Sequence, residues 1–291
     1  MHGVLIVDKP AGVSSALAVD RVKHALGVRR VGHGGTLDPL ATGVLAVCLG
    51  GATKIAQYLL AHDKAYEADG LLGIETDTLD RTGTVTAERA VSVTREAMLA
   101  AIALHTGELD QIPPMYSAIK QDGIRMYKRA RAGEEVERAS RKIRIDQLDL
   151  VMFEPPRFRI AIACSKGTYV RSLVADLGTA VGAGAHLTEL RRTRSGLFTL
   201  AQAIRLDRVG IDDLTPHLIP MSAATNLPTV VAAADLHGQI RSGLQLPVER
   251  FTTENLERFQ LVAEGGRLLA IVHVEAGVVF YDRVFPEPES G

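Results

Sequence analysis

Residues 32–45 read Gly32-His33-Gly34-Gly35-Thr36-Leu37-Asp38-Pro39-Leu40-Ala41-Thr42-Gly43-Val44-Leu45 and place one carboxylate, that of Asp38, in a loop directly before an apolar run. Four glycines flank Asp38, and glycine stands where a chain takes a positive φ or approaches a ligand closely. Pro39 favours an extended backbone at Asp38 itself. The stretch therefore predicts a carboxylate with little bulk around it, open to a substrate.

Asp38 has three interpretations from these residues alone. An Asp-Pro pair is a common turn signal, in which the carboxylate bonds to its own backbone. In the second interpretation the glycines build a phosphate cradle, although no Gly-Lys-Ser/Thr sequence and no dinucleotide-binding fingerprint accompanies them. In the third, Asp38 is a nucleophile, which requires a partner that keeps the carboxylate ionised.

Arg171 is the candidate for that partner. It falls in the first turn of a helix that Thr168 is expected to cap. A cation in that turn opposes the helix dipole at a cost of about 0.3–1 kcal/mol, so an anion is expected beside it. A carboxylate there would be kept ionised and oriented. A surface arginine bonded to water is the alternative.

Two tyrosines offer flat faces to a ring-shaped substrate. Tyr66 follows Lys64-Ala65, and Tyr169 follows Lys166-Gly167-Thr168. Stacking of an aromatic side chain on a base contributes roughly 1–3 kcal/mol, whereas a tyrosine in a strand is more often part of the core. His33 suits a general base, a metal ligand or a polar wedge. No second histidine lies at ligand spacing, so we expect no metal.

The composition limits the class of protein. The chain has 291 residues, a formal net charge of −1 and two cysteines. We expect one large and one small domain, no disulfide, no membrane span, no signal peptide and a cytoplasmic location. Three groups of basic residues predict either solvated surface or a basic face for phosphates: 29–30, 120–144 and 191–194.

Helices and strands are expected to mix without a strict βαβ rhythm, which favours an α+β fold. Expected strands are 3–7, 44–49, 66–73, 142–153, 157–164, 186–198, 268–274 and 278–284. Expected helices are 15–26, 53–62, 94–105, 168–181 and 233–242, with a short basic helix at 127–132. We expect loops at 75–83 and 111–118 and a linker at 223–228.

Six segments, in order, resemble the bacterial tRNA pseudouridine-55 synthases, the TruB-type branch of the pseudouridine synthases: 5–12, 31–45, 64–66, 113–118, 165–171 and 184–196. Six ordered segments are far more specific than one motif. The resemblance implies a catalytic domain over 1–224, built on a mixed, mainly antiparallel sheet with flanking helices. It also implies an RNA-clamping insertion at about 120–144 and a small, mainly β, PUA-like RNA-binding domain over 225–291.

The resemblance also implies a reaction without cofactor or metal. The uridine at position 55 of the tRNA T-loop is flipped out, and its uracil is detached from C1′, turned and rejoined through C5. Asp38 matches the essential aspartate, whose attack on sugar C1′ or on base C6 stays open. Arg171 matches its partner, and Tyr66 matches the tyrosine that stacks on uracil and assists proton transfer. The other matching positions line the base pocket (Tyr169 and Leu190), fill the space that the flipped nucleotide leaves (His33), or are candidate phosphate contacts: Lys9, Lys64 and Lys166.

Three functions remain in competition at this stage. The first is a stand-alone, monomeric tRNA isomerase that binds the T-arm without a guide RNA. The second is a non-catalytic RNA-binding or RNA-folding protein on the same scaffold. The third is an enzyme that uses Asp38 and Arg171 on a small anionic substrate. The presence of both residues favours the first, and steeply salt-dependent tRNA binding would separate it from the third.

Overall fold

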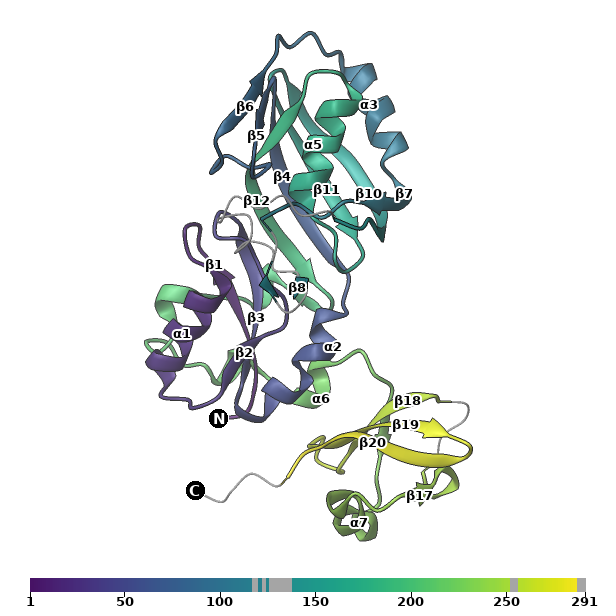
Figure 1. Ribbon diagram of the computed structural model, residues 1–291. Helices are drawn as coiled ribbons and strands as arrows, with labels where there is room; N and C mark the ends of the chain where they lie inside the picture. Colours follow the sequence, from purple (N-terminus) through teal and green to yellow (C-terminus); the bar gives the residue numbers. More distant parts are fainter. Residues whose placement is uncertain (117–119, 122–123, 126–137, 252–255, 287–291) are drawn as a thin grey trace.

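One large mixed sheet organises the first three quarters of the chain (Figure 1). The computed structural model describes residues 1–116, 120–121, 124–125, 138–251 and 256–286, with side chains left out at 120–121 and 124–125. The strand order is β14-β1-β3-β12-β4-β11-β10-β7, with β2, β13 and β15 paired beside this path. The strands are β1 (Gly3–Lys9), β2 (Val31–His33), β3 (Thr42–Leu49), β4 (Lys64–Leu72), β7 (Gly107–Gln111), β10 (Arg141–Glu154), β11 (Arg157–Cys164), β12 (Ala185–Ser195), β13 (Phe198–Thr199), β14 (Ile204–Arg205) and β15 (Leu218–Ile219).

The sheet consists of two halves that meet at β3 and β12. These strands pair in parallel at two positions, Thr42 with Arg191 and Gly43 with Arg192. Gly43 has a φ of +99°, and a Cβ placed there would lie 2.2 Å from the carbonyl oxygen of Arg192. Glycine is therefore required where the two backbones approach. Parallel pairs are β3–β12 and β1–β14, and antiparallel pairs dominate the rest, which confirms the mixed, mainly antiparallel sheet.

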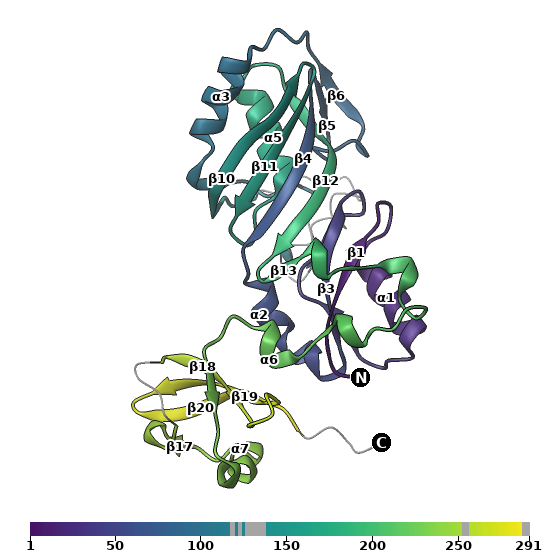
Figure 2. The same ribbon diagram turned by 180° about the vertical axis from the view of Figure 1, so that it is seen from behind.

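Two helices cover one face of the second half, as Figures 1 and 2 show from opposite sides. They are α3 (Arg95–Leu104) and α5 (Val170–Ala180). The apolar stripe of α5 is buried as its spacing predicts, with Val170, Leu173, Val174 and Leu177 in the core. Tyr169, not Thr168, is the residue before the helix, and the Thr168 hydroxyl donates to the Ser165 carbonyl at 3.0 Å. The expected cap at Thr168 is therefore wrong by one residue.

The first half of the sheet carries α1 (Ser15–Leu26). The Ser14 hydroxyl accepts from the backbone N–H of Leu17, and Gly27 ends the helix with a φ of 61°. The expected helix at 53–62 is a 3₁₀-helix, η1 (Gly50–Ile55), followed by the short α2 (Ala56–Leu60). Both ends of α1 were thus correctly predicted, whereas the second helix was only partly so.

Several short elements differ from the expectation. The expected loop at 75–83 connects a hairpin, β5 (Ile74–Thr76) and β6 (Val85–Glu88). Strand β7 was missed, and the expected strand from 142 begins at Arg141 as β10, so the last residues of the expected insertion belong to the sheet. The expected helix at 127–132 lies outside the described residues. The remaining short elements are β8 (Lys120–Gln121), β9 (Ile124–Arg125), η2 (Leu200–Gln202), η3 (Leu206–Arg208), η4 (Thr215–His217) and α6 (Met221–Ala224).

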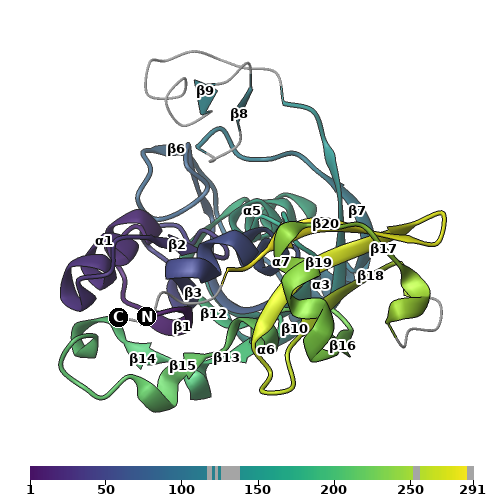
Figure 3. The same ribbon diagram turned by 90° about the horizontal axis from the view of Figure 1, so that it is seen from below.

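A second, smaller sheet follows, with the order β16-β18-β19-β20-β17 (Figure 3). Its elements are β16 (Thr229–Val231), η5 (Ala234–Leu236), α7 (His237–Ser242), β17 (Leu246–Pro247), η6 (Val248–Arg250), β18 (Arg258–Val262), β19 (Leu268–Glu275) and β20 (Val278–Val284). The sheet shares an apolar cluster with the first one, in which Ile271 and Phe285 join Ile6 and Val44. Lys54 reinforces this contact, because its Nζ donates to the Val284 carbonyl at 3.1 Å. The division of the chain at 224/225 stays a prediction.

Candidate functional site

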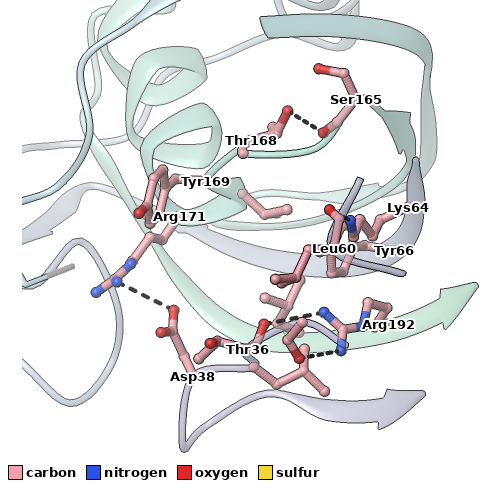
Figure 4. Close-up of a pocket in the computed structure, with 15 residues that line it drawn as sticks. Thr36, Asp38, Leu60, Lys64, Tyr66, Ser165, Thr168, Tyr169, Arg171 and Arg192 are labelled. Carbon is pink, nitrogen blue, oxygen red and sulfur yellow. Dashed lines mark hydrogen bonds and ion pairs between the residues drawn. The ribbon is translucent and has the colours of Figure 1, made fainter. Parts of the chain in front are cut away.

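A pocket of about 340 Å³ opens between the loop before β3, the edge of β4 and β12, and the start of α5 (Figure 4). It therefore lies where the two halves of the sheet meet. Its lining combines apolar, aromatic and charged side chains with the backbone of two glycine-containing loops. The lining residues are Gly35, Thr36, Leu37, Asp38, Leu60, Lys64, Tyr66, Ser165, Gly167, Thr168, Tyr169, Val170, Arg171, Leu190 and Arg192.

Asp38 and Arg171 face one another across this pocket (Figure 4). Nη2 of Arg171 lies 3.3 Å from Oδ2 of Asp38. The Arg171 side chain is 5% exposed and that of Asp38 is 35% exposed, so the pair combines a buried cation with a carboxylate that reaches the cavity. Arg171 also donates from Nη2 to the Tyr116 carbonyl at 2.6 Å. The sequence argument that an anion accompanies Arg171 is in agreement with this geometry.

A second carboxylate, that of Asp80, lies close to the guanidinium of Arg171. Its Oδ2 lies 3.8 Å from Nη1 of Arg171, and its side chain is 4% exposed. Its Oδ1 accepts from the backbone N–H of Thr82 at 2.9 Å and from the Thr78 hydroxyl at 2.8 Å. The sequence analysis missed Asp80, because a stretch rich in Asp and Thr is typical of a turn. The hairpin β5–β6 thus supplies a carboxylate to Nη1 of the buried arginine, whereas Asp38 approaches Nη2.

The charges around Asp38 pull the pKa of its carboxyl in opposite directions. Burial raises this pKa above its usual range, and the neighbouring Asp80 carboxylate adds to the rise. Arg171 and, to a smaller extent, Lys9 lower it. Because the net direction is upward, Arg171 is the main group that keeps Asp38 available as an anion.

Two tyrosines and a leucine form apolar walls. Tyr66 on β4 is 9% exposed, and Leu190 on β12 is 8% exposed. The Tyr169 ring lies 6.0 Å from the guanidinium carbon of Arg171. Gln111, which the sequence analysis did not single out, fixes the Tyr169 backbone by donating to its carbonyl at 3.0 Å and accepting from its N–H at 2.8 Å. The pocket thus brings together Asp38, Arg171, Tyr66, Tyr169 and Leu190.

Two of the three lysines that were expected to contact phosphates lie inside the protein, which corrects that expectation for both. Lys9 is fully buried, and its Nζ donates to the carbonyls of Pro10, Val13 and Pro39. Lys64 is 7% exposed, and its Nζ donates to the carbonyls of Leu60 and His62. Burial lowers the pKa of each lysine to about 8. These bonds direct both amines to the backbone and away from a surface ligand.

The basic group at 191–194 is likewise not a uniform surface cluster. Arg192 is 2% exposed, whereas Arg191 is half-buried and pairs with Asp8 at 2.9 Å. Lys166 is exposed, and its chain neighbours Ser165 and Gly167 line the pocket. His33, at the end of β2, is half-buried and is not among the lining residues. Of the three expected lysines, Lys166 is therefore the one with an exposed side chain, next in sequence to two residues that line the pocket.

Among the described residues, no group of three or more His, Cys, Asp or Glu side chains could hold a metal ion. No helix in the same residues is long and apolar enough to cross a membrane.

Comparisons with known proteins give a consistent result. Residues 23–170 match the N-terminal domain of the TruB family pseudouridylate synthases, and residues 171–223 match the tRNA pseudouridylate synthase B C-terminal domain. The tRNA pseudouridine synthase B of Ralstonia nicotianae is 44% identical over 298 residues, which cover 98% of this chain and 94% of the relative. That of Pseudomonas paraeruginosa is 53% identical over 207 residues, which cover 71% and 68%.

Solved structures agree in fold over nearly the whole chain. A crystal structure of a Cbf5-Nop10-Gar1 complex contains a chain with a TM-score of 0.76 and 26% identity. An H/ACA RNP bound to a substrate RNA containing 2′-deoxyuridine contains one with a TM-score of 0.74 and 25% identity. Each of the two structural alignments covers 98% of this chain and 85% of the solved chain. With its two matched domains, its relatives and its fold, this chain belongs to the TruB family of pseudouridylate synthases.

Proposed function

We propose that this protein isomerises the uridine at position 55 of the tRNA T-loop to pseudouridine, with Asp38 as its essential carboxylate. The TruB family isomerises uridine in tRNA. The observation that carries the assignment of Asp38 is its pairing with the buried Arg171, at 3.3 Å, in a pocket walled by aromatic side chains. A buried, permanently charged arginine keeps a carboxylate ionised and oriented for attack.

The proposed reaction is an isomerisation and requires few groups beyond these residues. The C1′–N1 bond breaks, uracil turns, and a C1′–C5 bond forms. The proton that leaves C5 is balanced by one gained at N1, so the substrate and product have the same atoms and no redox partner enters. Attack by Asp38 on C1′ and attack on C6 both need the ionised carboxylate, which Arg171 favours.

The nucleotide is proposed to enter the pocket by flipping out of the T-loop. Flipping costs a few kcal/mol, and stacking on Tyr66 and Tyr169 offsets part of this cost. Leu190 completes the wall against the base. His33 is proposed to fill the space that the nucleotide leaves, and Lys166, exposed at the rim, to contact a phosphate. Lys9 and Lys64 are proposed to hold the pocket loops through the carbonyls that they bind.

The proposed partner is the T-arm of tRNA, bound by a monomer in the cytoplasm without a guide RNA. This chain covers 94% of a bacterial tRNA pseudouridine synthase B but 85% of the similar chain in an H/ACA RNP. The fuller match supports an enzyme that acts without a guide RNA. The smaller sheet, assigned as a PUA-like domain, and the segment at about 120–144 are proposed to contact the RNA outside the pocket.

The test is to incubate the purified protein with unmodified tRNA and to map pseudouridine at nucleotide resolution. We expect modification at position 55 alone, with Asp38→Asn folded, able to bind tRNA and inactive. The matched control is Asp20→Asn, which changes an exposed aspartate on α1. Turnover by Asp38→Asn would overturn the role of Asp38. Absence of pseudouridine with the wild-type protein, together with intact tRNA folding activity in Asp38→Ala, would favour a non-catalytic RNA-folding protein instead.

A further inference from the structure

The largest of the fully buried side chains in the described part of the chain is that of Arg192, which the proposed reaction does not yet use. Arg192 lies on β12, is 2% exposed and lines the pocket. Its backbone pairs with Gly43 of β3 on one side and with Tyr66 of β4 on the other. Directly opposite residues on neighbouring strands place their side chains on the same face. The guanidinium of Arg192 therefore lies at the junction of the two halves, beside Tyr66.

Three of the five N–H groups of Arg192 hold the loop that carries Asp38. Nε donates to the Val44 carbonyl at 2.7 Å. Nη1 and Nη2 donate to the carbonyls of Thr36 and Gly35 at 3.2 Å each (Figure 4). Thr36 and Gly35 come just before Asp38, and Val44 lies in the strand after it. One planar side chain thus fixes the backbone on both sides of the reacting carboxylate.

Arg192 also faces Tyr66, its cross-strand neighbour on β4, and both side chains line the pocket. Burial raises the pKa of the Tyr66 phenol, and the positive charge of Arg192 opposes this rise. The loop of Asp38 and the ring of Tyr66 therefore both lie next to this one side chain.

The buried guanidinium of Arg192 is also unusual because no carboxylate pairs with it among the described residues. Its neighbour Arg191, by contrast, pairs with Asp8. A buried charge without an opposite charge is costly, and the hydrogen bonds of Arg192 go to neutral backbone carbonyls. The positive charges of Lys9 and Lys64 increase the free-energy cost of burying Arg192, since its charge lowers the pKa of both lysines. An arginine that only filled space in this sheet could be replaced by an apolar side chain at less cost.

We propose that Arg192 is a positioning residue for the isomerisation, which holds the Asp38 loop and the Tyr66 ring at a fixed separation around the base. This inference rests on the proposed function, because it assigns Arg192 a part in the same reaction. Since Arg192 acts through other residues and not on the RNA backbone, it affects the turnover of bound tRNA and leaves tRNA affinity unchanged. The planar guanidinium is the essential feature, because its three nitrogens donate to three separate carbonyls. The single ammonium group of a lysine cannot reach all three acceptors at once.

The experiment compares Arg192→Lys with Arg191→Lys, a neighbouring change at a half-buried, ion-paired arginine, in the full chain. Thermal unfolding and tRNA binding identify folded variants, and single-turnover rates and KM are then measured on tRNA. We expect Arg192→Lys to lose at least tenfold in turnover rate, with KM and tRNA affinity within about twofold of wild type. We expect Arg191→Lys to keep the wild-type rate. Equal rates for the two variants would overturn the inference.

A double-mutant cycle with Tyr66→Phe separates positioning from a structural role. If Arg192 acts through the Tyr66 hydroxyl, Arg192→Lys costs less in the Tyr66→Phe background than in wild type. Additive losses would contradict the connection. Should Arg192→Lys fail to fold, Tyr66→Phe in the wild-type background carries the test, and a full wild-type rate there would refute it. Absence of pseudouridine from the wild-type protein would instead refute the proposed function, so the two failures are distinguishable.

Discussion

Oδ2 of Asp38 and Nη2 of Arg171 lie 3.3 Å apart, although the two residues belong to opposite halves of the sheet. Asp38 precedes β3, and Arg171 opens the helix that covers the other half. Among the described residues, backbone pairing between the two halves is limited to two positions of β3 and β12. The geometry of this ion pair therefore depends on how the halves pack together, and a change that separates the two backbones at Gly43 is expected to affect catalysis without touching the substrate.

The first prediction concerns pH. Burial raises the pKa of Asp38, and the proposed reaction needs its ionised form. The rate is therefore expected to fall as the pH falls through a pKa above the usual carboxyl range of about 4. Single-turnover rates on tRNA between pH 4 and pH 8 check this, with tRNA binding by Asp38→Asn measured over the same range as a control. An acid limb centred below pH 4 would contradict the burial of the ionised group.

The second prediction concerns Asp80, whose Oδ2 lies 3.8 Å from Nη1 of Arg171. Asp80→Asn weakens the orientation of Arg171, so we expect the turnover rate to fall about tenfold or more. The same change removes a charge that raises the pKa of Asp38, so the acid limb is expected to move to lower pH. Asp77→Asn is the matched control, because Asp77 lies in the same hairpin and accepts from the Thr84 N–H. An unchanged rate in Asp80→Asn would show that Arg171 keeps its orientation without Asp80.

The third prediction compares two glycines that share a φ of +99°. Gly107→Ala meets no atom within 4 Å, whereas a Cβ at Gly43 lies 2.2 Å from the Arg192 carbonyl oxygen. Both changes introduce backbone strain of roughly 1–2 kcal/mol, and Gly43→Ala adds an overpacking cost of roughly 1–3 kcal/mol. Urea unfolding is expected to show the larger loss for Gly43→Ala, together with a loss of turnover. Equal destabilisation would mean that β3 and β12 tolerate separation.

The fourth prediction is a stability measurement at Lys9. Its pKa is lowered from 10.5 to about 8 by burial, so the unfolded chain binds more protons than the native protein between these pH values. The stability penalty of the charged amine is full below pH 8 and fades as the pH rises toward 10.5. Relative to Lys9→Met, wild type is expected to gain about 2 kcal/mol in unfolding free energy from pH 7 to pH 9.5.

The control for this measurement is Lys23→Met, at an exposed position of α1. Its unfolding free energy should run parallel to that of wild type over the same pH range. Parallel curves for Lys9→Met as well would mean that the Lys9 amine titrates as an exposed lysine does.

The sequence was sufficient to predict the α+β class and the residues that meet in the pocket, but it misplaced the basic side chains. Lys9, Lys64 and Arg192 were interpreted as candidates for a phosphate-binding surface, and all three are buried. Arg192 bonds to carbonyls of distant segments, such as Gly35, whereas Lys9 and Lys64 bond mostly to carbonyls within four residues. Whether a carbonyl points toward such a side chain depends on the folded backbone, which the residue pattern does not record.

The missed strands have a related cause. The sequence Gly-Glu-Leu-Asp-Gln of β7 and the sequence Arg-Phe-Gln-Leu-Val of β18 are short and partly polar. β7 is extended because it pairs with β10 at the edge of the sheet, and β18 because it lies between β16 and β19. Strand formation at such positions depends on the neighbouring strand more than on intrinsic propensity. Asp80 escaped notice for the same reason, since its importance comes from Arg171, far along the chain.

The position of β14 and β15 beside β1 has a consequence for synthesis on the ribosome. β1 emerges well before its partners at 204–205 and 218–219. Arg192 likewise emerges long after the Asp38 loop, whose carbonyls it binds. Domains fold as units during translation, and contacts between distant segments form slowly. The nascent chain therefore holds β1 with one edge unpaired until residues 204–219 have been translated, and the Asp38 loop reaches its final geometry only after Arg192 has emerged.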